Sequence, residues 1–473
     1  MKQTVETPKL ERSISFIGFL GMGIGCVFGS SWLLMAGYWM TAAGGPVNAA
    51  LAFAAGLIMI MTLALSYISI MPAFPEGGGE MQYARRAFGN TAGLIAGWSG
   101  FLVNGIVSAW QTLAITRMAE TLFPALSEWP VVYHIGSEPV TVAGLLIGFF
   151  LVAAIAFLQY RGTRLFARLQ SILVGTVLLL VISAIIAGLF YADPGNLRMT
   201  AEKPLFEGAV AFLVLLPFSI AGWENIAKGV EEARASLSIQ KIGQALMWSI
   251  LISTFLYAGL FFLQASLVPW PEMTQSKLPL VDSLVRLTGH TVFRVIILSA
   301  AIFNVLGVFN GVFYGAVRSL YALGNAGLLP RVFSRIHPTY KTPHAAIITV
   351  AVLVGITPLI GNAAFGSLVK VAAFFYVVLW GSTVLSARKL QLQLNILSLS
   401  PFKTTAVRRL ISTGGIIAAL FILAAMIWPT SPGALSWPGD YGLLALLICP
   451  CLVFHFLKRT GIVRGASSMT TDA

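Results

Sequence analysis

Twelve long apolar runs dominate this sequence of 473 residues. A run of about 18 or more apolar residues can cross the hydrocarbon core of a bilayer as a helix, and backbone polar groups at that depth must bond within their own segment. We therefore predict an all-α integral membrane protein with 12 transmembrane helices. The runs cover approximately residues 16–40, 47–71, 92–117, 140–159, 169–191, 208–230, 243–268, 291–322, 344–361, 366–387, 410–428 and 440–458.

The composition supports a lipid environment and argues against nucleic acid as a partner. Charged residues make up 10% of the chain, whereas a soluble protein carries about 25%. The formal net charge is +13, but the basic residues lie singly or in short groups between the apolar runs. That distribution is typical of residues that set membrane topology. The lipid bilayer is thus the expected surrounding, and no nucleic-acid partner is predicted.

The basic residues also predict an orientation. If the N-terminus is cytoplasmic, 23 of the 30 Lys and Arg residues fall in cytoplasmic segments. Cytoplasmic loops of membrane proteins carry this excess, so we predict a multi-pass protein of the cell membrane with both termini cytoplasmic. The polar start of the chain indicates no cleavable signal peptide, and the first apolar run is too long for one.

Two of the twelve runs are interrupted by helix-weakening residues near their middle. One interruption covers Gly21–Trp32 in the first run, and the other covers Pro217–Glu224 in the sixth. They lie five spans apart, so helices 1–5 and 6–10 would have opposite orientations in the bilayer. Paired interruptions in inverted halves indicate a transporter binding site. The alternative is that both are glycine-rich packing seams between intact helices.

Four stretches, in order along the chain, resemble the amino acid–polyamine–organocation (APC) transporter superfamily. The resemblance implies the LeuT fold, with a 5+5 inverted repeat, broken helices 1 and 6, and two additional helices 11 and 12. It also implies alternating access and a small-molecule substrate with an amino group, usually an amino acid. The stretches are Gly29–Leu33, Ala73–Gly89, Phe218–Glu224 with Glu231 and Glu232, and Arg318–Pro343.

This resemblance divides the chain into four parts. Residues 1–15 form a cytoplasmic N-terminal segment, and residues 16–390 form the transport core of helices 1–10. Residues 391–464 hold helices 11 and 12, and residues 465–473 form a cytoplasmic tail.

The expected substrate site lies at the two interruptions. The first amides of the second half of helix 1 would bind a carboxylate, because a helix N-terminus favours an anion. Carbonyl groups freed at the breaks would take the ammonium group, because half-helix C-termini favour cations. The predicted amides are those of Gly29, Ser30 and Ser31, and the predicted carbonyls are those of Val27, Phe218 and Ala221.

Aromatic and polar side chains complete the predicted site. Phe218 and Trp223 are the predicted gate, although Phe218 could instead be a packing residue. Asn104 is the first choice among polar residues that could line the pocket or bond between helices; the others are Ser108, Gln111, Asn304 and Asn310. An inner gate of ion pairs is expected from Arg85, Arg86, Glu231, Glu232 and Arg318, with ordinary topogenic charge as the alternative for the arginines.

Departures from the family pattern limit what the resemblance implies. Ser31 replaces a glycine of the family's Gly-Ser-Gly motif. The stretch Gln170–Val177 lacks the helix 5 lysine that many members carry in place of a bound sodium, so the coupling ion, proton or sodium, is left open. Glu224 lies four residues before Lys228, the favourable order for a helical ion pair. The pair is either a coupling element or a structural strut.

Other functions are less well supported by the sequence. An amine or polyamine transporter of the same fold would need acidic residues in its pocket, and only Glu224 lies near the predicted site. A membrane amino-acid sensor would be expected to carry a soluble signalling domain, and no such domain is expected from this sequence. An enzyme would be indicated by metal-ligand spacing or by a mid-span histidine beside an acid or nucleophile, and the sequence shows neither pattern. No metal and no cofactor are therefore expected, and the sequence leaves the oligomeric state open.

Overall fold

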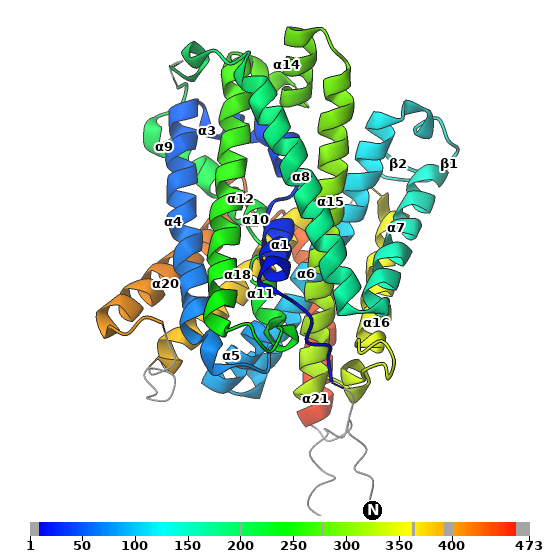
Figure 1. The fold of residues 1–473 in the computed structure, drawn as a ribbon, viewed down its shortest axis with the longest axis vertical. Coiled ribbons are helices and arrows are strands. Elements are labelled where there is room, and N and C mark those ends of the chain that lie inside the picture. Colours follow the sequence, from blue (N-terminus) through cyan, green and yellow to red (C-terminus); the bar gives the residue numbers. More distant parts are fainter. Residues whose placement is uncertain (1–8, 199–200, 277, 362–364, 392–400, 460–473) are drawn as a thin grey trace, which may run out of the picture.

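The computed structural model describes residues 9–198, 201–276, 278–361, 365–391 and 401–459. Within these residues, ten helical segments are long and apolar enough to cross a membrane, and most of them run along one common direction (Figure 1). The first segment, Phe16–Leu34, combines α1 (Phe16–Val27) and α2 (Ser31–Leu34). The others are α4 (Pro46–Ile70), α6 (Asn90–Leu122), α7 (Val142–Arg161), α8 (Thr163–Leu189), α12 (Ile239–Leu267), α15 (Val292–Asn325), α18 (Phe365–Leu390), α20 (Thr405–Ile427) and α21 (Gly439–Arg459).

The two remaining predicted spans are made of shorter helices. The run at 208–230 contains α9 (Leu205–Leu213), α10 (Leu216–Ser219) and α11 (Asn225–Lys228). The run at 344–361 contains α16 (His344–Gly355) and α17 (Thr357–Ile360). A proline stands in the first turn of both α10 and α17, where it cannot donate a hydrogen bond to the preceding turn. The prediction of 12 spans depends on whether these two interrupted runs also cross the bilayer.

Smaller elements connect the long helices. One short helix, α3 (Ala36–Ala43), continues the first span beyond α2, and α5 (Gly79–Phe88) joins α4 to α6. The helices α13 (Trp270–Gln275) and α14 (Pro279–Thr288) join α12 to α15. The 3₁₀ turns are η1 (Met71–Ala73), η2 (Pro124–Leu126), η3 (Pro194–Arg198), η4 (Val230–Glu232) and η5 (Arg331–Ser334).

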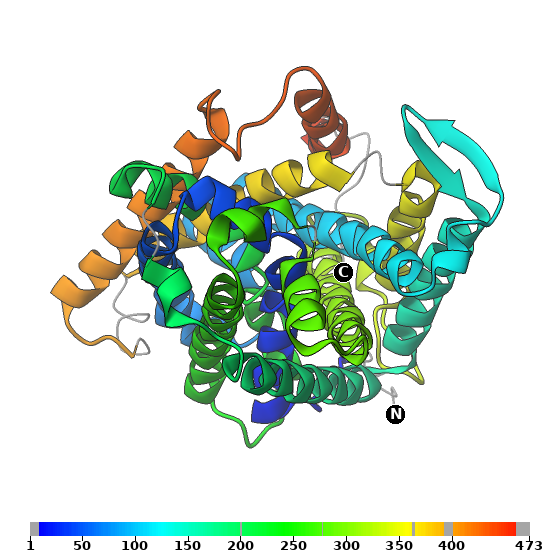
Figure 2. The same cartoon turned by 90° about the horizontal axis from the view of Figure 1, so that it is seen from above.

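A small β-hairpin that the sequence analysis did not predict accompanies the helical architecture. Strands β1 (Val131–Ile135) and β2 (Glu138–Thr141) pair antiparallel, and the hairpin extends beyond the helices at the edge of the molecule (Figure 2). Its connection has only two residues, and the first, Gly136, has a φ of +60°, as tight hairpin turns require. The short β-branched run before Gly136 was the available signal for this hairpin.

The interrupted first span lies inside the bundle. α1 packs against α8, α12 and α15, and every residue from Gly21 to Val27 is buried. The glycines of this run permit close packing: a Cβ at Gly23 would lie 2.5 Å from the Ser249 side chain. By contrast, α20 packs on the outer sides of α4 and α18, and α21 packs on α6 and α18. The buried core is therefore centred on the broken first span.

The N-terminal segment is attached to the chain after α11. Residues 9–14 precede α1, and the Ile14 amide donates to the Glu232 carbonyl at 3.0 Å. The Arg234 amide in turn donates to the Ile14 carbonyl at 2.9 Å. Three of the four predicted parts of the chain lie partly or wholly outside the described residues. These are residues 1–8 of the N-terminal segment, residues 392–400 and 460–464 of the part with helices 11 and 12, and the whole tail 465–473.

Candidate functional site

The break in the first span covers residues 28–30, between the end of α1 at Val27 and the start of α2 at Ser31. The Gly29 amide donates to the Tyr257 hydroxyl oxygen at 2.8 Å. The same hydroxyl lies 3.3 Å from the Val27 carbonyl oxygen and 3.2 Å from that of Gly29, so its proton can be donated to either. The Phe28 carbonyl accepts from Asn304 Nδ2 at 2.5 Å. Side chains of α12 and α15 therefore satisfy the backbone of this break.

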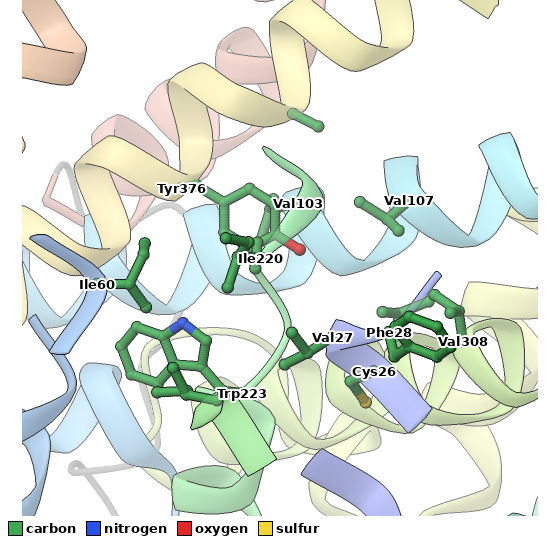
Figure 3. Packing of buried hydrophobic residues seen from close by; sticks show 14 of the residues in the cluster. Cys26, Val27, Phe28, Ile60, Val103, Val107, Ile220, Trp223, Val308 and Tyr376 are labelled. Atoms are coloured by element: carbon green, nitrogen blue, oxygen red, sulfur yellow. The ribbon is translucent and has the colours of Figure 1, made fainter. Parts of the chain in front are cut away.

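The break in the sixth span lies directly against the first. Residues 220–224 connect α10 to α11, and within them Gly222 has a φ of +108°. A Cβ at Gly222 would lie 2.6 Å from the Cys26 carbonyl oxygen, so only glycine allows this approach. Figure 3 shows Val27, with Cys26 nearby, beside the irregular segment that runs from Ile220 to Trp223. Two irregular segments far apart in sequence thus meet in the buried core.

The predicted substrate residues are mostly buried around these breaks. Val27, Ser30, Ser31 and Ala221 are buried, and within the described residues Ser30 Oγ has no hydrogen-bond partner. Val27 and Gly29 come together at the Tyr257 hydroxyl, as described above. A small cavity of about 10 Å³ adjoins the break at Phe28. That volume holds at most one water molecule, so this side of the break is closed.

The two predicted gate residues lie in different surroundings. Phe218 is half-buried, and its ring meets the edge of Trp110 at a centroid distance of 6.2 Å. Trp223 is fully buried between Tyr67, at 4.9 Å, and Trp380, at 5.8 Å. Trp223 is therefore enclosed by α4 and α18, whereas Phe218 retains partial exposure. The gating role of both residues stays a prediction.

The ion pair expected between Glu224 and Lys228 is not formed. Lys228 Nζ instead lies 3.2 Å from Glu80 Oε1, and both side chains are almost completely buried. The i, i+4 geometry needs a continuous helix, but the chain is irregular up to Glu224 and α11 begins only at Asn225. Glu224 Oε2 accepts from the Gly222 amide at 3.0 Å, and Oε1 has no hydrogen-bond partner among the described residues.

A chain of buried amides links Lys228 to α6. Lys228 Nζ donates to Asn225 Oδ1 at 2.9 Å, and Asn225 Nδ2 donates to Asn104 Oδ1 at 2.7 Å. Asn104 Nδ2 donates to the Gly100 carbonyl at 2.8 Å. Because an ammonium group can only donate, Lys228 sets the direction of every bond in this chain. Asn104 therefore joins helices here, one of the two roles considered for it.

A second buried ion pair lies near the N-terminal segment. Glu232 accepts two bonds from the Arg318 guanidinium, at 2.6 and 2.7 Å, and both side chains are buried. Thr163 Oγ1 donates to Glu232 Oε1 at 2.6 Å, and the Tyr314 hydroxyl donates to Oε2. This arrangement ties η4 to α8 and α15. Of the predicted inner gate, Glu232 and Arg318 form a pair, whereas Arg85 bonds to Asn90 on the surface.

Gln170 occupies the junction of three helices. Its Nε2 donates to the Gly307 carbonyl at 3.1 Å, and its Oε1 accepts from Asn310 Nδ2 at 2.7 Å. A Cβ at Gly25 would lie only 1.8 Å from Gln170 Nε2. This neutral amide thus lies in the helix 5 stretch that lacks a lysine, and it connects α8 with α15 beside α1.

Glu231 provides a prediction about pH. It follows the sixth span, and burial, followed by the neighbouring Glu232 carboxylate, raises its pKa from 4.5 to about 7, with a smaller contribution from Glu76 and opposed by Arg318 and Arg12. A carboxyl group whose pKa is higher in the folded state than in the unfolded state stabilises the fold at pH values below its unfolded pKa. This stabilisation is lost as the pH rises from about 4.5 to about 7. We expect the thermal midpoint to fall over this window, and to fall less in Glu231→Gln. The exposed Glu128→Gln is the control, and an unchanged pH profile in Glu231→Gln would contradict the assignment.

Several residues of this site were missed in the sequence. Tyr257 and Glu80 act on segments 228 and 148 residues away, so no local spacing indicated either contact. Gln264, which donates to the Trp32 carbonyl at 3.0 Å, lies seven residues after Tyr257 on α12. Polar residues at such helical spacing in an apolar span were the available signal, since polar groups at membrane depth require partners.

Comparison with known proteins matches this chain to membrane transport proteins. The amino acid permease family model matches residues 14–449. A branched-chain amino acid permease of Bacillus subtilis strain 168 is 23% identical over 90% of this chain and 91% of its own length. A methylthioribose transporter of the same organism is 21% identical, covering 89% and 91%. A low-affinity putrescine importer of Escherichia coli K12 is 25% identical, covering 65% and 66%.

Proposed function

This chain belongs to the amino acid permease family, and from that premise we propose that it is a secondary active transporter that moves an amino acid across the cell membrane by alternating access. The family and these relatives are transporters rather than enzymes. The observation that carries the proposal is the contact between the two broken segments, at Cys26 and Gly222. Irregular backbone at membrane depth is tolerated where protein or a cavity surrounds it, and it is typical of transporter sites.

The proposed site binds both charged groups of an amino acid. The amides of Gly29, Ser30 and Ser31 stand at the start of α2, and they would bind the carboxylate. The carbonyls of Val27, Phe218 and Ala221 would bind the ammonium group. Phe218 and Trp223 are the proposed gate, and Asn104 is proposed as a lining residue that also joins helices. The unpartnered Ser30 Oγ supports a substrate contact here, because buried polar atoms ordinarily have partners.

The proposed architecture is the LeuT type with 12 transmembrane helices. In it, the interrupted runs at 208–230 and 344–361 both cross the bilayer, helices 1–5 and 6–10 form inverted repeats, and both termini are cytoplasmic. The distribution of basic residues supports this orientation. The site needs no cofactor, and Glu224 is the candidate coupling residue, since it is buried and one of its carboxylate oxygens has no partner among the described residues.

A polyamine is the second candidate substrate. The similarity to a putrescine importer favours it. A diamine has no carboxylate, so the amides proposed as carboxylate ligands at the start of α2 would have no anionic partner, and Glu224 would be the nearest acidic residue along either broken segment. The charge pattern of the site therefore favours an amino acid.

Tyr257 gives a direct prediction for transport. Its hydroxyl contacts the Gly29 amide, the first of the three proposed carboxylate ligands. We expect Tyr257→Phe to raise the KM for substrate roughly two- to tenfold, because one hydrogen bond contributes about 0.5–1.5 kcal/mol. The yield of folded protein should be unchanged. Uptake kinetics measure this effect, with the exposed Tyr191→Phe as the control; an equal KM in both variants would remove Tyr257 from the site.

Uptake by proteoliposomes that contain the purified protein tests the function. Labelled amino acids and polyamines are compared with and without imposed sodium and proton gradients. We expect saturable uptake of an amino acid, abolished when Ser31 is replaced by a bulky residue and weakened by Phe218→Ala. The gradient that accelerates uptake identifies the coupling ion.

Other outcomes would redirect the proposal. Uptake of polyamines alone would favour the second candidate. Binding without transport under every gradient, including exchange from preloaded vesicles, would replace the transporter with a membrane sensor of amino acids.

A further inference from the structure

Four basic residues surround a cavity at the end of the bundle that is predicted to face the cytoplasm. Arg161 ends α7, Arg164 and Arg168 lie in the first two turns of α8, and Lys341 precedes α16. The cavity has a volume of about 590 Å³, and among the residues that the structure describes Glu11 provides the only carboxylate in its lining. Four cations against one carboxylate leave three positive charges unneutralised within the described lining of a space large enough for a phosphodiester group.

Two of the four basic side chains, Arg161 and Arg164, contact neighbouring residues. Arg161 Nη1 donates to the Tyr340 hydroxyl at 3.0 Å, and its guanidinium lies 5.3 Å from the centre of the Phe157 ring. Arg164 pairs with Glu11 at 3.2 Å, but the Arg164 side chain is 83% exposed, so this pair is weak. The α8 N-terminus at Gly162 has no side-chain cap, and its free amides add to the attraction for an anion.

An apolar groove adjoins this basic cavity along the side of the bundle. It runs between α7 and α16, which pack together at the right of Figure 1, and it also has a volume of about 590 Å³. Phe157 connects the two spaces, because its ring lines the groove while it contacts Arg161. The groove is lined by Phe149, Ala153, Phe157, Ile348, Val352 and Gly355, among others.

We propose that this basic cavity and the α7–α16 groove together bind one anionic phospholipid. The phosphodiester lies among Arg161, Arg164, Arg168 and Lys341, and an acyl chain occupies the groove. A basic pocket between transmembrane helices on the cytoplasmic side suits an anionic headgroup. The phosphate displaces Glu11 from Arg164, and Glu11 belongs to the N-terminal segment that precedes α1. The lipid therefore binds next to the segment attached to η4.

Native mass spectrometry of the full chain in detergent tests this site. Dioleoyl phosphatidylglycerol and dioleoyl phosphatidylcholine share their acyl chains and differ in headgroup charge. We expect phosphatidylglycerol to be retained about tenfold or more over phosphatidylcholine, and we expect the triple variant Arg164→Gln, Arg168→Gln, Lys341→Gln to lose this preference. The control removes three charges elsewhere, through Arg388→Gln, Lys389→Gln and Arg409→Gln, and should keep it.

A groove-filling variant tests the acyl chain separately. A side chain at Gly355 meets open space, since no atom lies within 4 Å of its Cβ position, so Gly355→Phe should fold and should weaken phosphatidylglycerol binding several-fold. Inorganic phosphate is the second probe. Phosphate that competes as well as the lipid, or Gly355→Phe with unchanged lipid binding, would overturn the lipid site in favour of a free anion. Equal retention of both lipids by the unaltered protein would also overturn it.

Discussion

Replacing Lys228 with methionine is expected to lower the free energy of unfolding by about 3–5 kcal/mol. The ammonium group of Lys228 is the ion-pair partner of Glu80, and the two side chains are 1% and 2% exposed. Removing the lysine leaves a buried carboxylate that, within the described part of the chain, keeps one side-chain hydrogen bond, from the Tyr67 hydroxyl at 3.1 Å. It also releases Asn225 Oδ1, so the amide chain toward Asn104 loses its fixed direction. Thermal and denaturant unfolding of the purified protein measure the loss.

A double variant separates the ion pair from the loss of packing. Combining Lys228→Met with Glu80→Gln removes both charges, and most of the lost stability should return, because a buried pair replaced as a whole is often close to neutral. Lys241→Met is the matched control, since Lys241 is exposed on α12. If the double variant is as unstable as Lys228→Met alone, the buried charge is not the cause of the loss.

The long helices could be predicted from the sequence because lipid imposes a simple requirement on them. A continuous apolar run must be helical at membrane depth, and ten helical segments of the required length and hydropathy are present in the described residues. The interruptions were also predictable. The proline at 217 and the glycine at 222 weaken a helix locally. The sixth span is broken just before α10, which has Pro217 in its first turn, and again over residues 220–224, which include Gly222.

The partners of charged groups could not be predicted in the same way. Local spacing indicated Glu224 for Lys228, yet the structure pairs Lys228 with Glu80 on α5. This pairing depends on how the turn Gly77–Gly79, with three positive φ angles, brings α5 against α11. Such a contact follows from tertiary packing, which overrides the small energy of an i, i+4 pair. The same reasoning applies to Tyr257, whose hydroxyl reaches the break in the first span from α12.

Gly222→Ala is expected to reduce transport about tenfold or more while the protein still inserts and folds. The φ of +108° lies in a region open mainly to glycine, and holding another residue there costs about 1–3 kcal/mol. The added Cβ would also lie 2.6 Å from the Cys26 carbonyl oxygen, so the two broken segments must separate. Their separation would change the spacing between the carbonyl groups proposed to bind the ammonium group and the amides proposed to bind the carboxylate.

Initial rates of uptake, normalised to folded protein, measure the effect of Gly222→Ala. Gly259→Ala is the matched control, because Gly259 lies within α12 and no atom stands within 4 Å of its Cβ position. An alanine in a helix is more favourable than a glycine by about 1 kcal/mol, so this control should keep full activity. A rate for Gly222→Ala equal to that of the control would mean that the contact between the two breaks can widen without loss of function. The substrate site would then have to lie away from the Cys26–Gly222 contact.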